Sequence, residues 1–172
     1  MDINKIKQAQ SNLKIYFDDG LIKKQKFDKL VYDTYMKNHT ESIEVAQKLL
    51  DDDVSDLWVI VSSYYSMFYI ANAYLVSIGL KIGHKIAHKV TADSLIVYLK
   101  EHIEDNLIEN YELLAGDALS ISENLVESFE FERVKRSKIQ YETTDNIKKY
   151  KAETSIRRAK LFALEIEKLF EE

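Results

Sequence analysis

The residues whose types and spacing could do chemistry are the cations around residue 135. Arg133 and Arg136 stand three positions apart, with Lys135 and Lys138 beside them. Arginine carries a fixed charge and a planar set of donors that can hold two phosphate oxygens at once. Because residues three apart share one face of a helix, this group predicts a phosphate-binding site. The alternative is a helix C-terminus whose carbonyl groups attract cations.

The distribution of charge sets this run of cations apart from the rest of the chain. The net charge is -5, which excludes a protein that binds nucleic acid through its overall charge. Residues 101–130 hold nine acidic side chains and no Lys or Arg, whereas residues 131–160 hold ten basic and four acidic side chains. This asymmetry indicates a polar interaction surface near residue 135. Two solvated helix faces that compensate each other are the alternative.

Tyrosine and histidine provide the other candidate groups. Tyr141 follows Arg136 by five positions, and its phenol could donate a proton, stack on a base or fill the core. Its ordinary pKa of about 10 makes it a poor base. His84 and His88 have the four-residue spacing of two metal ligands on a helix, but no third ligand is evident. Since cysteine and a phosphate-cradling glycine loop are also absent, we expect neither a metal nor a cofactor.

Helices must position these residues. The 172-residue chain has no proline and four glycines, and 46% of it is hydrophobic, so long helices with few turns fit best. We predict one all-α domain over residues 1–172, an antiparallel bundle of four to five long helices. Apolar spacing places these helices at about residues 21–50, 55–78, 85–102, 107–132 and 145–170, after a helical N-terminal extension in residues 1–20.

The segment from Leu57 to Leu80 carries no charge and is long enough to span a bilayer. Its many Ser, Tyr and Asn residues favour instead a helix buried on all sides within a soluble protein. The N-terminus lacks the apolar core of a signal peptide, and the absence of cysteine fits a reducing compartment. We therefore expect a cytoplasmic protein that does not enter the membrane.

Two stretches of the chain resemble proteins of the HEPN superfamily (higher eukaryotes and prokaryotes nucleotide-binding domain). The first is SSYYSMFYIANAYL, residues 62–75, followed by a glycine and HKIAHKVTADSLIVYL. It is similar to the second HEPN helix, where a tyrosine pair and small residues pack centrally, and to the His-containing segment after it. The second, residues 131–170, resembles the C-terminal half, where an Arg-containing motif ends one helix. The resemblance covers about residues 28–170 and implies a homodimer. It also places His88 at the start of the third helix, where it caps that helix or forms a hydrogen bond near the second.

The resemblance also implies a function. Many HEPN proteins carry an Arg-x4-6-His motif and are metal-independent endoribonucleases, with two protomers sharing one cleft. Cleavage beside a 2′-hydroxyl needs a proton acceptor, a proton donor and positive charge on the phosphate. This chain has RSKIQY, an Arg-x4-Tyr. It therefore resembles an RNA-directed protein with an altered motif, a ribonuclease or toxin of stress response or phage defence.

In that function, Arg136 binds the scissile phosphate and Tyr141 donates or positions a proton. The expected contacts to RNA or nucleotide come from Arg133, Lys135, Lys138 and His88. Whether the protein is an enzyme stays open, because a non-catalytic HEPN module would bind a nucleotide or a partner such as a minimal nucleotidyltransferase. A purely structural helical adaptor is the third alternative.

Overall fold

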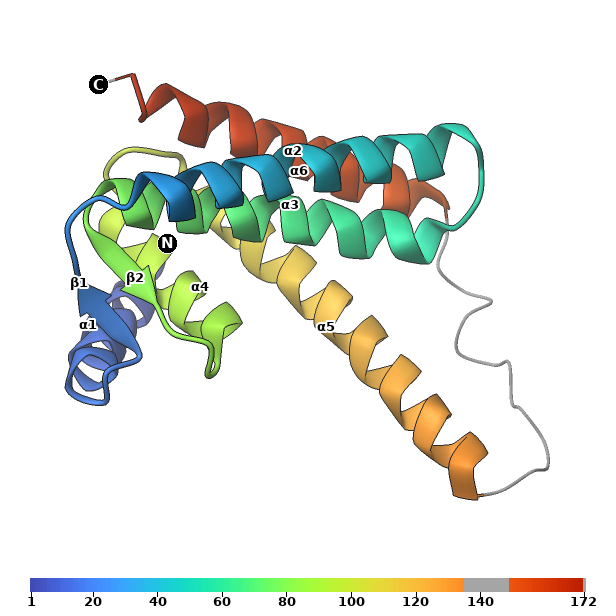
Figure 1. The fold of residues 1–172 in the computed structure, drawn as a ribbon, viewed down its shortest axis with the longest axis horizontal. Helices are drawn as coiled ribbons and strands as arrows, with labels where there is room; N and C mark the ends of the chain where they lie inside the picture. Colours follow the sequence, from blue (N-terminus) through green and yellow to red (C-terminus); the bar gives the residue numbers. More distant parts are fainter. Residues whose placement is uncertain (135–148, 172) are drawn as a thin grey trace.

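The structure is a computed structural model that describes the backbone of residues 1–134 and 149–171 and the side chains of residues 1–121 and 149–171. Within these ranges the chain forms six helices and one two-stranded sheet (Figure 1). The elements are α1 (Ile3–Asp18), β1 (Ile22–Lys24), α2 (Lys29–Asp51), α3 (Asp56–Ser77), β2 (Leu80–Ile82), α4 (Ala87–Tyr98), α5 (Asp105–Val134) and α6 (Lys149–Lys168). The prediction of a helical fold is thus confirmed, and the small sheet is an addition to it.

Helix α3 is the centre of the fold. It begins at the N-cap Ser55, whose side chain accepts from the Trp58 backbone N–H, and it contacts α2, α4, α5 and α6. Among the described residues it is the one helix long and apolar enough to cross a bilayer, and 78% of its apolar window is buried. Burial of most of its residues is expected of an apolar helix that forms the core of a helical domain.

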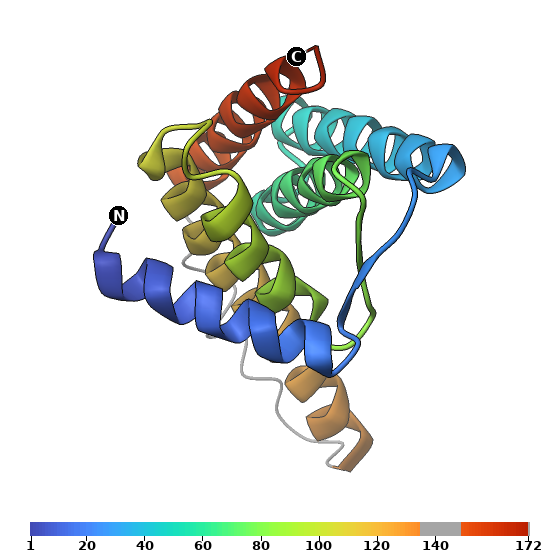
Figure 2. The same cartoon turned by 90° about the vertical axis from the view of Figure 1, so that its left-hand side faces the viewer.

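Figure 1 shows how the other long helices are arranged around α3. Helices α2, α3 and α6 run side by side, while α5 crosses beneath α3 and then diverges from it. Both views show the C-terminal turns of α5 extending beyond the other helices (Figures 1 and 2). The core on the α5 side is therefore built by its N-terminal half, where Leu107, Ile108, Tyr111 and Leu114 are buried.

The prediction of a helix over residues 21–50 is wrong at its start, because residues 22–24 form a short strand. Residues 22–24 pair antiparallel with residues 80–82, and Lys23 lies opposite Lys81. The backbone N–H of Gln25 extends this pairing by donating to the Gly79 carbonyl at 2.9 Å. Gly79 has a φ of +81°, and a Cβ there would lie 3.0 Å from the Gln25 carbonyl oxygen, so only glycine fits. Helix α2 consequently starts at Lys29, after the N-cap Asp28.

Helices α1 and α4 form a second layer beside the sheet (Figure 2). Asp93 on α4 joins them, because it accepts from the Tyr16 hydroxyl at 2.8 Å and from the Asn12 amide at 3.0 Å. Helix α4 is shorter than the predicted 85–102, since Ile86 adopts a left-handed conformation with a φ of 45° just before it. His84 lies in the connection before α4, and only His88 is part of the helix, so the four-residue spacing of the two histidines does not place them on one helical face.

Candidate functional site

The predicted phosphate-binding cations fall mainly outside the residues that the structure describes. Lys135, Arg136, Lys138 and Tyr141 lie in the segment 135–148, and their roles stay predictions. Arg133 is in the last turn of α5, with its side chain also outside the described set. The end of α5 does not lie beside α4, so one protomer does not bring Arg133 next to His88 through these two helices (Figure 1).

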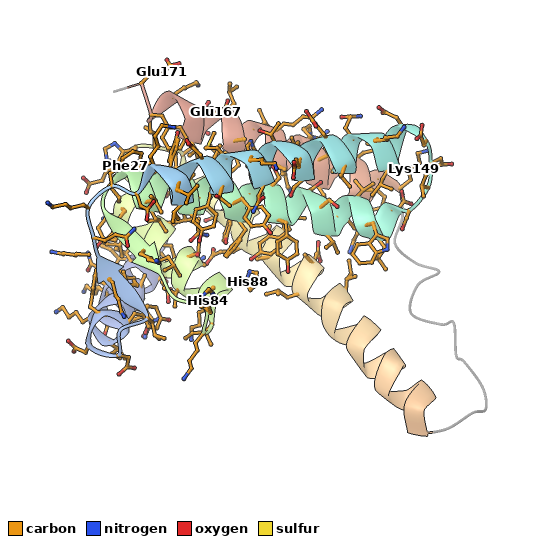
Figure 3. All side chains as sticks on the ribbon, in the orientation of Figure 1. Phe27, His84, His88, Lys149, Glu167 and Glu171 are labelled. Carbon is orange, nitrogen blue, oxygen red and sulfur yellow. The ribbon has the colours of Figure 1, made fainter. Side chains whose placement is uncertain are left out.

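His88 is the predicted site residue whose surroundings are described. It occupies the first turn of α4, is half-buried and contacts α3 (Figure 3). Its Nδ1 lies 2.5 Å from the hydroxyl oxygen of Tyr64 on α3. Its ring packs against Phe68, with centroids 4.7 Å apart, and against Tyr65, with centroids 6.0 Å apart. The hydrogen bond to the preceding long helix agrees with our expectation for His88.

The direction of this hydrogen bond depends on which imidazole nitrogen of His88 carries the hydrogen. Burial raises the pKa of the Tyr64 phenol, so the hydroxyl keeps its proton, and we assign it as the donor to Nδ1. Burial also lowers the pKa of His88, which favours the neutral imidazole. A neutral imidazole that accepts at Nδ1 carries its hydrogen on Nε2. In the tautomer assigned here, His88 Nε2 is a hydrogen-bond donor, and no side chain among those described pairs with it.

A second tyrosine lies behind Tyr64. The rings of Tyr64 and Tyr111 are 5.8 Å apart, and Tyr111 on α5 is fully buried. Burial raises the pKa of Tyr111 well above its ordinary value, and the neighbouring Tyr64 adds to this effect. The two hydroxyl groups are near enough to affect each other's pKa, but the Tyr111 hydroxyl has no partner with hydrogen-bond geometry in the described structure. Tyr64 therefore contacts both the buried Tyr111 ring and the half-buried His88 ring.

Aromatic rings on α3 continue this site across the surface. Trp58, Tyr65 and Tyr69 follow one another at helical spacing, and the Trp58 side chain is 50% exposed. Tyr35 of α2 extends the row, with its ring 6.3 Å from that of Tyr69. Half-exposed rings of this kind can stack on nucleobases, and aromatic residues are also enriched at protein interfaces. We call Tyr35, Trp58, Tyr65 and Tyr69 the aromatic row.

The arrangement favours binding over proton abstraction. His88 offers a neutral N–H, which can donate to a phosphate or base oxygen, but its other nitrogen is occupied by Tyr64. Among the side chains that the structure describes, no three His, Asp or Glu residues gather as metal ligands. The other buried histidine, His39, contacts the Ser66 hydroxyl at 2.8 Å and is almost inaccessible, so it has a structural role.

Sequence reasoning singled out His88 but not its partners. Tyr64 was one of eleven tyrosines, and nothing in its spacing distinguishes it from Tyr65. Tyr111 was assigned to the apolar face of a helix, where the structure places it, without its contact to Tyr64. No protein-family model and no curated protein sequence matches the chain.

Proposed function

We propose that the chain is a cytoplasmic, RNA-directed protein of the HEPN type that acts in stress response or defence. The observation that carries the proposal is His88, a neutral imidazole held by Tyr64 with its Nε2 donor free beside the aromatic row. The cationic segment that follows α5 adds the fixed charge that an RNA phosphate requires. The pairing of α2 with α3 and α6 supports an antiparallel, HEPN-like bundle.

Each residue in the proposed site has a role that follows from its chemistry. Arg136 binds the scissile phosphate, Tyr141 donates or positions a proton, and Arg133 holds a flanking phosphate. Lys135 and Lys138 contact the backbone as point charges. His88 donates from Nε2 to an RNA oxygen.

A homodimer would bring the two halves of this site together. The end of α5 lies away from α4 of the same protomer, so a second protomer could supply it. Trp58 at the start of α3 supports such an interface, because half of its surface is exposed to solvent. Light scattering coupled to size exclusion tests this, with Trp58→Ala expected to weaken the dimer. A monomeric wild-type protein at micromolar concentration would exclude the shared site.

The central experiment is incubation of the purified protein with total RNA in the presence of a chelator. We expect cleavage that Arg136→Ala abolishes and His88→Ala reduces. His84→Ala is the matched control, because His84 lies four positions earlier and is exposed in the turn before α4. Equal activity in wild type and Arg136→Ala would overturn the assigned role of Arg136. If His84→Ala and His88→Ala lowered RNA cleavage equally, His88 would have no specific role in cleavage.

The second candidate is a non-catalytic HEPN module that binds a nucleotide or a minimal nucleotidyltransferase. The orientation of His88 favours it, since Nε2 carries a hydrogen and cannot accept a proton from a 2′-hydroxyl. Calorimetric titration with nucleoside mono- and triphosphates, and capture of a minimal nucleotidyltransferase, test this candidate. Binding without RNA cleavage would select it over the ribonuclease, and failure of both tests would reject it.

A further inference from the structure

The sheet brings together two lysine-rich segments that are far apart in the sequence. Residues 20–27 contain three lysines, residues 79–92 contain three lysines and two histidines, and neither segment contains Asp or Glu. Strands β1 and β2 lie within these segments and pair with each other. A chain with a net charge of -5 thus gathers six lysines, Lys23, Lys24, Lys26, Lys81, Lys85 and Lys89, around one small sheet.

Lys23 and Lys81 are the centre of this group. They are opposite partners in the antiparallel register, which places their Cα atoms about 4.5–5.5 Å apart with both side chains on one face. Ile22 and Ile82, the neighbouring pair, are buried on the other face, and both lysines are exposed. Like charges directly opposite each other destabilise a sheet. This pair therefore lowers the stability of the sheet without any packing gain.

Lys85 and Lys89 extend the charge from the sheet to α4. Four residues separate β2 from α4, so Lys85 lies within about 14 Å of Lys81 along the chain. Lys89 lies four positions after Lys85, in the first turn of α4, and directly follows His88. Both lysines are exposed. The positive surface consequently begins at the sheet and ends beside the His88 donor.

These lysines are not neutralised by acidic side chains. None of the six forms an ion pair with a side chain in the described ranges. Two of the bordering carboxylates have partners elsewhere: Asp28 accepts from the Val31 backbone N–H, and Asp93 accepts from Tyr16 and Asn12. By contrast, Lys37 and Lys48 on α2 each face a carboxylate one turn further along.

We propose that the surface formed by Lys23, Lys81, Lys85 and Lys89 binds the phosphate backbone of single-stranded RNA and leads the strand to His88. This inference rests on the proposed RNA-directed function and adds a binding surface to it. Charge complementarity selects a polyanion, and the half-exposed ring of Tyr65 beside His88 favours one with unpaired bases. Lysines track such a backbone without reading its sequence.

The test is fluorescence anisotropy of the full chain with a labelled single-stranded RNA of mixed sequence at several salt concentrations. We expect Lys23→Ala with Lys81→Ala to raise Kd several-fold and to flatten the slope of log Kd against log salt by roughly 0.7 per lysine. Lys85→Ala with Lys89→Ala should act in the same direction. The control is Lys37→Ala with Lys48→Ala, which removes equal charge from α2 and should change Kd little.

Each outcome decides one point. A wild-type protein that binds no RNA overturns this proposal together with the proposed function. Normal RNA binding with equal effects of the sheet pair and the α2 pair overturns the lysine surface alone. Vesicles of phosphatidylcholine and phosphatidylserine provide the last arm: loss of vesicle binding with unchanged RNA binding in the sheet variant would assign the surface to membranes and overturn the proposal. Thermal unfolding by circular dichroism confirms that each variant is folded.

Discussion

The Tyr64 hydroxyl oxygen lies 2.5 Å from Nδ1 of His88 across the contact between α3 and α4, and this single hydrogen bond determines which nitrogen of the histidine is left for a ligand. It joins the most buried helix of the fold to a half-exposed side chain at its surface. Because Tyr64 is fully buried, its ring cannot turn away without opening the core. The orientation of His88 is therefore fixed before any ligand arrives.

Tyr64→Phe should remove the hydrogen bond that orients His88 while keeping the aromatic ring. We expect a loss of about 1 kcal/mol in the free energy of unfolding, measured with urea, since one hydrogen bond disappears. The ¹⁵N spectrum of His88 should change from the tautomer with hydrogen on Nε2 to a mixture of both. Tyr65→Phe is the control, because no described partner binds the Tyr65 hydroxyl. Unchanged His88 nitrogen shifts in Tyr64→Phe would contradict the bond.

His39 should make the protein sensitive to mild acid. Burial lowers its pKa below the ordinary 6.5, so the unfolded chain binds a proton at a higher pH than the folded chain. The free energy of unfolding should thus decrease as the pH falls through about 6.5 toward the lower folded pKa. Urea unfolding at pH 7.5 and pH 5.5 measures this, and His39→Gln should show a smaller difference. Equal pH dependence in both proteins would assign the effect to other groups, His88 among them.

Lys81→Glu should have opposite effects on stability and on RNA binding. It replaces a like-charge cross-strand pair with an ion pair to Lys23, which should raise the free energy of unfolding by ~0.2–1 kcal/mol. The same change puts a negative charge on the proposed RNA surface and should raise Kd for RNA. Lys37→Glu on α2 removes a pairing with Glu41 and should not stabilise the protein. A destabilised Lys81→Glu variant would show that the two side chains do not face each other.

Ile86→Gly should stabilise the protein although it adds a glycine. Ile86 has a φ of 45°, a conformation that costs a non-glycine residue about 1–2 kcal/mol, and its side chain is 55% exposed. Glycine removes that cost but loses ~0.5–1 kcal/mol more in chain entropy on folding, so the net gain lies between zero and ~1.5 kcal/mol. Calorimetry should show a higher Tm. Ile78→Gly, at an exposed position with a φ of -89°, should lower it.

Much of the fold could be predicted from local sequence. The uncharged run from Leu57 to Leu80 indicated a buried helix, and α3 is buried on most of its surface. Helix α5 followed the apolar spacing of Leu107, Tyr111 and Leu114, all of which are buried. These elements were predictable because each carries its own periodic pattern over many residues.

The strands and the site were not predictable in the same way. Three-residue strands have no period to detect, and Ile22 is assigned to β1 only by its pairing with Ile82 on a distant part of the chain. The like-charge pair of Lys23 and Lys81 follows from that pairing and was missed for the same reason. The contact of His88 with Tyr64 depends on how α4 packs on α3, which the sequence of neither helix states. Tertiary packing, and not local preference, decided each of these features.

The pairing of β1 with β2 also affects the order in which the chain can assemble. It joins Lys24 to Leu80 and so encloses the hairpin of α2 and α3 in a loop. The entropic cost of closing a loop grows with the length of the loop. When the α2–α3 hairpin is already folded, fewer flexible residues remain between β1 and β2, so this cost is smaller. The hairpin should therefore form first, with β1 and α1 docking afterwards. In the native protein, fluctuations that separate the strands should release α1 before they disturb α3, so amide exchange should be faster in α1 than in α3.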